Sequence, residues 1–440
     1  MDNTSGFFPN QTNGIVAIYT NWTPAEEAQA IAYSYDGGYT FFKYSGNPVI
    51  SLKMHGFRDP KVIWYEKTRT WVMAVSHADA HFVEFYTSKN LTSWTKASTF
   101  SNPAIVGAFE CPQFIPIPFR PTETPIDYYL LVISLGGGGR SGTSTVKYFP
   151  GTFNGTHFIP VDDLATRTFD FGPDFYATSF FYNLPVDANP VSISWAANLN
   201  YAGNTPTGPA EGWRSVMTVA RAHYLTNTSS NGYDLVSEPY NIAPMYDRLL
   251  FSERRLGNGG LVLDYTTLDS GAVSLGLNFT TSSSASSAVV EICFTSSSTG
   301  ENITLSLAMS SISSDASSST ATFKVSRANI SGWTSNLPLS TSSVVDLNPV
   351  ASNASNGSRT YDVRGIMDRT ILEAFVNGGI DAGTMIFFPS RRLDTIVLKI
   401  DALESEDFVD FEAWGLKSGW SASGNRESAD KSNWKPKPEL

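Results

Sequence analysis

The chain has 440 residues, 41% of them hydrophobic, and its 30 Lys and Arg against 41 Asp and Glu give a formal net charge of −11. A chain of this length commonly divides into two domains, and its composition is that of a folded globular protein. The acidic balance argues against partners such as nucleic acid or an anionic membrane surface, both of which need a concentrated basic patch. No apolar run approaches the roughly 18 residues of a membrane span.

Short strands at regular spacing are predicted for the first half of the chain. Residues 61–65, 70–76 and 81–88 are apolar or aromatic segments separated by polar turns, and they predict an antiparallel meander of the size of a propeller blade. Similar segments follow at 128–134 and 191–195. A β-propeller explains this repetition better than a closed barrel, because repeated blades protect sheet edges without one continuous sheet.

The texture changes after about residue 240, where Ser-rich segments with alternating apolar residues predict a β-sandwich. The expected strands of this half include 288–294, 303–307, 322–325, 371–376, 385–388 and 395–400. The sequence therefore predicts an all-β chain with a propeller at 1–240, a sandwich at 241–416 and a polar, disordered tail at 417–440.

Two acidic segments at the starts of predicted blades are candidates for chemistry. Arg58 and Asp59 directly precede a strand, and Glu110 lies between aromatic residues. The innermost strand of each propeller blade begins beside the central axis, so carboxylates from successive blades can converge in one pocket. Hydrolysis of a glycosidic bond needs such a pair, with one carboxyl group as proton donor and another as nucleophile or base.

The surroundings of the two carboxyl groups suggest different roles. Burial against Phe109 and Phe114 would disfavour the ionised form of Glu110, which suits a general acid, while Arg58 would keep Asp59 ionised. Asp59 could then accept hydrogen bonds from sugar hydroxyls. On the residues alone, structural explanations are favoured: a salt bridge that starts a strand for Arg58 and Asp59, and a turn cap for Glu110.

A family resemblance changes this balance. Arg58-Asp59-Pro60-Lys61-Val62 and Glu110-Cys111-Pro112 resemble, at a similar separation, two of the three signature motifs of glycoside hydrolase family 32. The similarity to the yeast and fungal invertases of this family extends from about residue 3 to residue 415. Further segments that resemble them are 3–8, 35–41, 154–158, 195–198 and 371–378.

The resemblance implies a five-bladed propeller, its first blade incomplete here, followed by a sandwich. It also implies retaining hydrolysis of terminal β-D-fructofuranosides such as sucrose, without a metal or a cofactor. Asp59 would be the transition-state stabiliser that binds fructose hydroxyls, Arg58 its substrate-binding neighbour, and Glu110 the general acid/base.

Four further residues receive roles from the same resemblance. Trp195 would border the fructose pocket, and Cys111 would tune Glu110, although an ordinary buried cysteine explains Cys111 nearly as well. Asp174 and Tyr176 would contact substrate, with a structural role on the pocket rim as the equal alternative.

The third family motif, a Trp-Met-Asn-Asp-Pro-Asn-Gly-like run that supplies the aspartate nucleophile, is absent from the sequence, where the single Asp-Pro pair is Asp59-Pro60. We expect that the chain is truncated and that the missing segment, including a signal peptide, lies upstream. Exposed sheet edges would then make the chain prone to aggregation. Ala197 and Leu199 also depart from the Ser and Trp common in invertases, which leaves specificity beyond the fructose unit open.

Sequons for N-glycosylation are dense, which suggests a secreted glycoprotein, although chance explains some of them in a Ser-rich chain. They begin at Asn3, Asn10, Asn21, Asn90, Asn154, Asn227, Asn278, Asn302, Asn329, Asn353 and Asn356. The two cysteines, Cys111 and Cys293, are expected in different domains and unpaired. Self-association through the sandwich is a further expectation from the resemblance.

Two other functions compete with hydrolysis. Transfer of fructose to another sugar, which makes fructo-oligosaccharides, shares the same fructosyl-enzyme intermediate and differs only in what intercepts it. A non-catalytic fructan- or sucrose-binding protein could have kept Asp59 and Trp195 after losing its nucleophile, but the intact Glu110 argues against a long-standing loss.

Overall fold

The computed structural model describes residues 4–8, 14–121, 126–139, 143–185, 188–208, 212–227, 232–281, 287–311, 319–331, 340–352 and 357–419. Almost all regular structure in these residues is β-strand. The described residues also include three short 3₁₀ turns, η2 (Ala202–Asn204), η3 (Ala243–Met245) and η4 (Asn377–Gly379). None of the helices in the described residues has the length and apolar character that a membrane crossing requires.

Four antiparallel sheets form the N-terminal part of the described residues, and each takes its strands in chain order. The first sheet has three strands, β1 (Ile15–Trp22), β2 (Glu27–Ser34) and β3 (Phe42–Lys43). The second has β4 (Phe57–Tyr65), β5 (Thr70–His77), β6 (Phe82–Ser88) and β7 (Thr95–Phe100). The third has β8 (Ala108–Ile117), β9 (Tyr128–Gly136), β10 (Thr145–Phe153) and β11 (Phe158–Pro160), and the fourth has β12 (Tyr176–Phe180), β13 (Val191–Trp195), β14 (Arg221–Thr226) and β15 (Asp234–Pro239).

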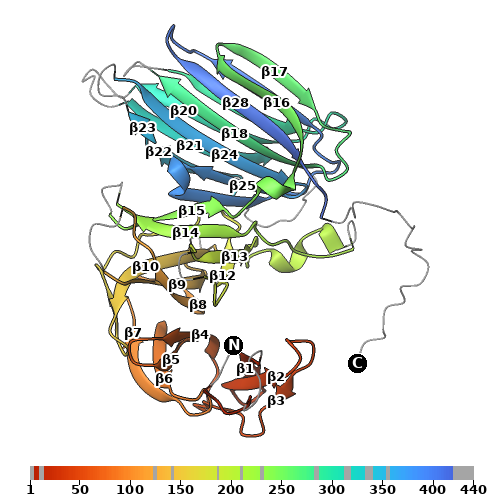
Figure 1. The fold of residues 1–440 in the computed structure, drawn as a ribbon. Coiled ribbons are helices and arrows are strands. Elements are labelled where there is room, and N and C mark those ends of the chain that lie inside the picture. The colour runs from red at the N-terminus through yellow and green to blue at the C-terminus, as the bar shows by residue number, and fades with distance from the viewer. Residues whose placement is uncertain are drawn as a thin grey trace, which may run out of the picture.

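These sheets follow one another as propeller blades below the C-terminal domain in Figure 1. Aromatic residues fill the space between the second and third blades, where Phe85 and Phe114 pack with ring centroids 5.1 Å apart. Much of the aromatic content of the chain therefore serves the core between blades. The described residues provide four of the five blades that the resemblance implies, and the first of these has three strands.

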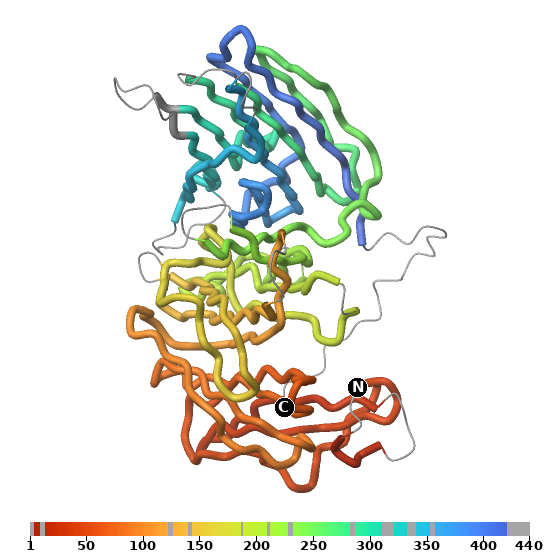
Figure 2. Tube along the Cα trace, turned by 60° about the vertical axis from the view of Figure 1, so that its left-hand side comes forward, coloured from red at the N-terminus to blue at the C-terminus, as the bar shows by residue number. Residues whose placement is uncertain are grey.

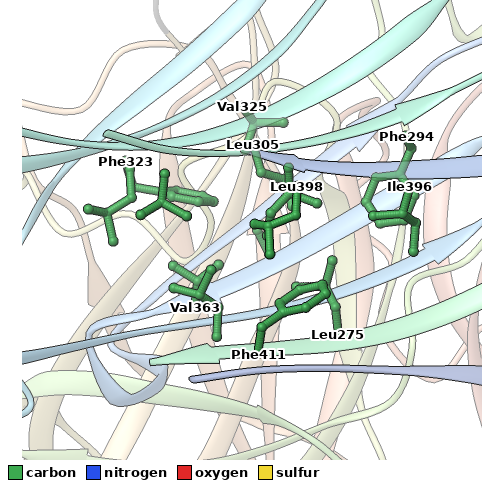
Figure 3. Close-up of a cluster of buried hydrophobic side chains, with 14 of the residues drawn as sticks. Leu275, Phe294, Leu305, Phe323, Val325, Val363, Ile396, Leu398 and Phe411 are labelled. Carbon is green, nitrogen blue, oxygen red and sulfur yellow. The ribbon is translucent and has the colours of Figure 1, made fainter. Parts of the chain in front are cut away.

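The C-terminal domain is a sandwich of two antiparallel sheets. One has the order β16 (Tyr246–Leu256), β28 (Phe408–Leu416), β18 (Ala272–Thr281), β24 (Arg359–Asp368), β25 (Ile371–Val376) and β26 (Asp381–Ile386), and β23 (Ala351–Ser352) pairs with β24. The other has the order β17 (Gly259–Asp264), β27 (Thr395–Asp401), β19 (Val289–Thr295), β20 (Asn302–Ser311), β21 (Ser319–Asn329) and β22 (Ser342–Leu347). Apolar side chains from both sheets interdigitate between them, as Figure 3 shows for Leu275 and Phe411 facing Leu305 and Leu398. The predicted all-β fold, a propeller followed by a sandwich, is confirmed.

The two domains are joined by a buried ionic contact. The guanidinium of Arg221 on β14 donates to Glu373 Oε2 on β25 at 2.7 and 3.2 Å, to Asp170 Oδ2 at 2.9 Å and to Thr384 Oγ1 on β26 at 2.7 Å. All of these side chains are buried. Close approach of the backbones is possible because residue 172 is glycine: a Cβ there would lie 2.1 Å from the carbonyl oxygen of Thr384. Figure 2 shows the propeller directly against the lower edge of the sandwich.

A second contact crosses the interface in the opposite direction. Arg327 on β21 of the sandwich donates to Asp174 Oδ2 at 2.7 Å, and the same oxygen accepts the Ile386 N–H at 2.8 Å. Tyr201 donates its hydroxyl to the other Asp174 oxygen. Each domain therefore contributes an arginine to an acidic residue of the other, and the two contacts together fix the relative position of the domains.

Some boundaries differ from the predictions. The strand expected at 385–388 ends at Ile386, and the strand expected at 322–325 is longer, Ser319–Asn329. The last propeller strand ends at Pro239 and the first sandwich strand begins at Tyr246. Residues 420–440 of the predicted tail, and the sequons at Asn3, Asn10, Asn353 and Asn356, lie outside the described residues.

Candidate active site

The innermost strands of the second, third and fourth blades share one irregularity. The pairing register slips between Arg58 and Lys61 in β4, between Glu110 and Gln113 in β8, and between Tyr176 and Ser179 in β12. In each bulge the residue after the first slipped position has a positive φ: 64° at Asp59, 48° at Cys111 and 49° at Ala177.

This left-handed conformation costs a non-glycine residue about 1 kcal/mol or more, and such costs concentrate at functional sites. In β4 and β8 a proline follows, which fits a bulge because proline has no N–H for the ladder. The bulges therefore re-aim one side chain per blade, and they bring Arg58, Glu110 and Tyr176 together.

Glu110 is the centre of this group. Arg58 Nη2 donates to Glu110 Oε1 at 2.8 Å, and the Tyr176 hydroxyl donates to Glu110 Oε2. Each carboxylate oxygen thus has a fixed donor from a different blade. About a fifth of the Glu110 side chain is exposed, so the group remains accessible from outside. Phe109 and Phe114, which the sequence placed against it, are buried instead in the apolar core between blades.

Asp59 lies on the other side of Arg58, with 30% of its side chain exposed. Its Oδ2 accepts the Cys111 N–H at 2.9 Å, and its own N–H donates to Thr20 Oγ1 at 2.9 Å. Arg58 Nε is 4.0 Å from Asp59 Oδ2, farther than from Glu110. Burial raises the pKa of Asp59, against the opposing effects of the Cys111 N–H and Arg58. Arg58 favours the ionised form of Asp59, as predicted, but its shorter contact is with Glu110.

Arg58 also forms an ion pair with Glu27, a residue that the sequence analysis did not single out. Glu27, at the start of β2, accepts from Arg58 Nη1 at 3.2 Å and from the Gly56 N–H at 2.5 Å. Burial disfavours the charge of Arg58, but Glu110, Glu27 and Asp59 together raise its pKa. Glu27 is only 8% exposed in a strand of mostly buried small residues, and a charged residue in such a strand is the signal that could have identified it.

Cys111 contributes through its backbone. Its N–H binds Asp59, and burial, with the nearby charges of Asp59 and Glu110, raises the pKa of its thiol. Among the described residues, Cys111 forms no hydrogen bond with Glu110. Any influence of Cys111 on the pKa of Glu110 would therefore act through Asp59, which accepts the Cys111 N–H. Cys111 and Cys293 are both free cysteines, as predicted.

Trp195 is the last residue of β13 and lies directly opposite Tyr176 across the β12–β13 ladder. Residues opposite each other in an antiparallel pair project from the same face of the sheet, so Trp195 lies beside Tyr176, on the strand next to the one that carries it. Its indole N–H donates to Ser215 Oγ, which fixes the plane of the ring. Gly136 at the end of β9 also lies beside Glu110: a Cβ there would lie 3.5 Å from Glu110 Oε2, from the Tyr176 hydroxyl and from Leu199 Cδ1.

Lys61 connects two blades that are not neighbours in the chain. Its Nζ donates to the Phe180 carbonyl at 2.6 Å and so joins β4 to β12. Burial lowers the pKa of Lys61 to about 8. The lysine lies three positions after Arg58 and holds the inner strands that carry Arg58 and Tyr176 in register with each other.

Asp174 does not belong to this group. Its side chain is fully buried at the domain interface, where Arg327, Ile386 and Tyr201 satisfy both carboxylate oxygens. Of the two alternatives for Asp174, substrate contact and a structural role on the pocket rim, this burial favours a structural role, but at the domain interface and not on the rim. Within the described residues, no three His, Cys, Asp or Glu side chains cluster as metal ligands.

The comparison with known proteins identifies the family. Residues 3–239 match the model described as "Glycosyl hydrolases family 32 N-terminal domain", and residues 262–415 match "Glycosyl hydrolases family 32 C terminal". The chain belongs to glycoside hydrolase family 32. An invertase of Schizosaccharomyces pombe is 34% identical over 439 residues, with 95% of this chain and 71% of the relative covered. An extracellular exo-inulinase of Meyerozyma guilliermondii is 32% identical, with coverage of 88% and 73%.

Solved structures of the family have the same fold. A β-fructofuranosidase of Schwanniomyces occidentalis in complex with fructosyl-erythritol superimposes with a TM-score of 0.81 at 27% identity, over 94% of this chain and 81% of that one. An exo-inulinase of Aspergillus awamori gives a TM-score of 0.79 at 26% identity, over 95% and 82%. The predicted family, and with it a glycoside hydrolase, is confirmed.

Proposed function

We propose that the site acts on terminal, non-reducing β-D-fructofuranosides such as sucrose, by hydrolysis with retention. The observation that carries the proposal is the convergence of Arg58, Asp59 and Glu110 from two neighbouring blades of a family 32 chain. The names of the relatives, an invertase, an exo-inulinase and a β-fructofuranosidase, support the same substrate class.

Glu110 is assigned the role of general acid/base. It would donate a proton to the oxygen that leaves from the fructosyl carbon, and later take a proton from the attacking water. Arg58 and Tyr176 would keep the carboxylate in place for both steps, because each holds one of its oxygens. A fixed orientation of this kind avoids reorganisation at the moment of proton transfer.

Asp59 is assigned the stabilisation of the transition state. Oδ2 already accepts the Cys111 N–H, so Oδ1 is the oxygen that would accept hydrogen bonds from fructose hydroxyls as positive charge develops on the ring. Trp195 would border the same sugar, and Tyr176 would contact it beside Glu110. Retention requires a carboxylate nucleophile as well. The family motif that supplies it is absent from the sequence, and no residue of the 440 is assigned that role.

Secretion and N-glycosylation are proposed on the strength of the sequons and of the extracellular relative. Self-association through the sandwich stays a prediction. No feature of the site favours transfer of fructose over hydrolysis.

The test measures two quantities on the 440-residue chain and on Glu110→Gln and Asp59→Ala variants. The first is release of glucose and fructose from sucrose, and the second is calorimetric binding of fructose. Because no residue of the 440 is assigned as nucleophile, the expected result is fructose binding that weakens in Asp59→Ala, without release of sugars by this chain. Release that disappears in Glu110→Gln would show that another carboxylate serves as nucleophile, and absence of both binding and release would overturn the assignment of the site. Release gained by a form that carries the family's nucleophile motif would separate a hydrolase from a binding protein.

A further inference from the structure

A groove lies on the sandwich, and Glu110 is not among the residues that line it. It has a volume of about 450 Å³ and opens on the outer face of the sheet that contains β16, β28, β18 and β24. One end of this outer face is covered by the propeller, where Ile366 and Phe375 are buried against Val219 and Ile242. The groove begins where this covering ends, and Pro239 and Ile242 of the interdomain connection form part of its wall.

A row of four residues crosses the floor, one from each strand. Ser252 on β16 pairs with Glu412 on β28, which pairs with Gly276 on β18, which pairs with Arg364 on β24. Gly276 keeps the middle of the floor open: a Cβ there would lie 3.3 Å from the Glu412 side chain. Neighbouring strands are about 4.8 Å apart, so the backbones of Glu412 and Arg364 are separated by about 10 Å.

Both charged residues of this row are exposed. Neither side chain forms a salt bridge or a hydrogen bond within the part of the chain that the structure describes, and Arg364 interacts electrostatically with Asp362, two positions before it. Their carboxylate and guanidinium groups are therefore available as strong acceptor and donor for a ligand between them.

The two ends of the groove differ in chemistry. At one end Trp414 stacks on Tyr246 with ring centroids 5.2 Å apart and an angle of 8° between the rings, and it presents a half-buried aromatic surface. At the other end Asn278 and Asp410 face each other across β18 and β28. An aromatic surface beside spaced polar groups suits a ring with apolar C–H faces and equatorial hydroxyls, because both kinds of surface are satisfied at once.

The charges of the lining are mixed. Two cations, Arg254 and Arg364, are accompanied by three anions, Glu253, Asp410 and Glu412. Such a lining favours neither an anionic nor a cationic ligand, and the net charge of −11 further disfavours an anion. We propose that the groove is a binding site for a neutral oligosaccharide, separate from the site around Glu110. The proposal does not depend on the reaction assigned to that site.

A glycan of this chain is the competing occupant. Asn278 begins the sequon Asn278-Phe279-Thr280, is exposed and lines the groove, so a sugar chain linked to it could fill the same space. Protein made in a host without N-glycosylation leaves the groove free for the first measurement. Protein from a glycosylating yeast, with Asn278 examined by peptide mass spectrometry, provides the second.

The experiment is calorimetric titration with nystose, a neutral tetrasaccharide, and with tetragalacturonate as its acidic counterpart. The unglycosylated chain is expected to bind nystose at the groove, and Arg364→Ala combined with Glu412→Ala should weaken this binding at least about tenfold. Gly276→Val, which fills the floor, should do the same while thermal melting reports an intact fold. Lys399→Ala, an exposed charge on the outer face of the opposite sheet, is the matched control and should change nothing.

The Arg58→Ala variant distinguishes nystose binding at the groove from binding at the site around Glu110. It should weaken binding at the site around Glu110 and leave binding at the groove unchanged. The proposal is overturned if all nystose binding disappears with Arg58→Ala, or if the groove variants bind as the unchanged chain does. Tighter binding of tetragalacturonate would also refute it. A glycan found on Asn278 whose removal by Asn278→Gln is needed for binding would show that the groove holds a glycan of the chain instead.

Discussion

Replacing Arg221 by methionine tests whether the buried ionic contact holds the two domains together. The guanidinium bonds two carboxylates and a hydroxyl, and all of the side chains involved are buried, so Arg221→Met leaves Asp170 and Glu373 without a counter-charge. Loss of one partner from a buried ion pair costs about 3–5 kcal/mol. This corresponds to a change of roughly 100-fold to 5000-fold in the ratio of folded to unfolded protein.

The assay is urea denaturation at pH 7, followed by tryptophan fluorescence. Lys67→Met is the matched control, because Lys67 also forms a short ion pair, 2.6 Å from Asp127, but both side chains are more than 60% exposed. Exposed pairs contribute about 0–1 kcal/mol, so the control should lose little stability. Equal losses in the two variants would refute the argument that burial of the Arg221 pair sets its importance.

Two further predictions concern the inner strands. Lys61→Met should be stabilising below pH 8 by up to about 3 kcal/mol, less the lost bond to Phe180, because the folded pKa of Lys61, about 8, lies below its ordinary 10.5. Between pH 8 and 10.5 the Lys61 amine of the unfolded chain keeps its proton while that of the folded chain loses it, so the stability advantage of Lys61→Met should shrink as the pH rises across this window. Urea denaturation of both proteins at several pH values checks this. A stability difference that does not change with pH contradicts it. Tyr176→Phe removes one of the two donors to Glu110 and should lower kcat about tenfold with unchanged thermal stability, measured on a form of the enzyme that releases fructose from sucrose; unchanged kcat would show that Arg58 alone orients Glu110.

The sequence predicted the fold and the approximate location of the site because both depend on local patterns. Alternating and aromatic segments marked the strands, and the positions of Asp59 and Glu110 at blade starts placed them near the axis. The direction of each side chain could not be predicted. A bulge inserts one residue into the ladder, so the alternation that normally tells which face a residue occupies fails at the very positions that carry Arg58, Glu110 and Tyr176.

Long-range partners were the second limit. For Asp174 the resemblance left substrate contact and a structural role on the pocket rim as equal alternatives, and neither anticipated its partner Arg327, which is 153 residues away and belongs to the other domain. Glu27 was missed for a similar reason, since its contact with Arg58 crosses from one blade to the next. Pairings of this kind follow from the packing of blades and domains, which no local pattern reports.

The buried Asp174 nevertheless bears on the site. It lies two residues before Tyr176, and its contacts with Arg327 and Ile386 fix the start of β12 against the sandwich. Tyr176 in turn donates to Glu110, so the position of this donor depends on a contact made by the other domain. The propeller supplies the side chains around Glu110, but the sandwich holds one of the three strands that deliver them. Its buried arginine thereby connects domain packing to the geometry of the site.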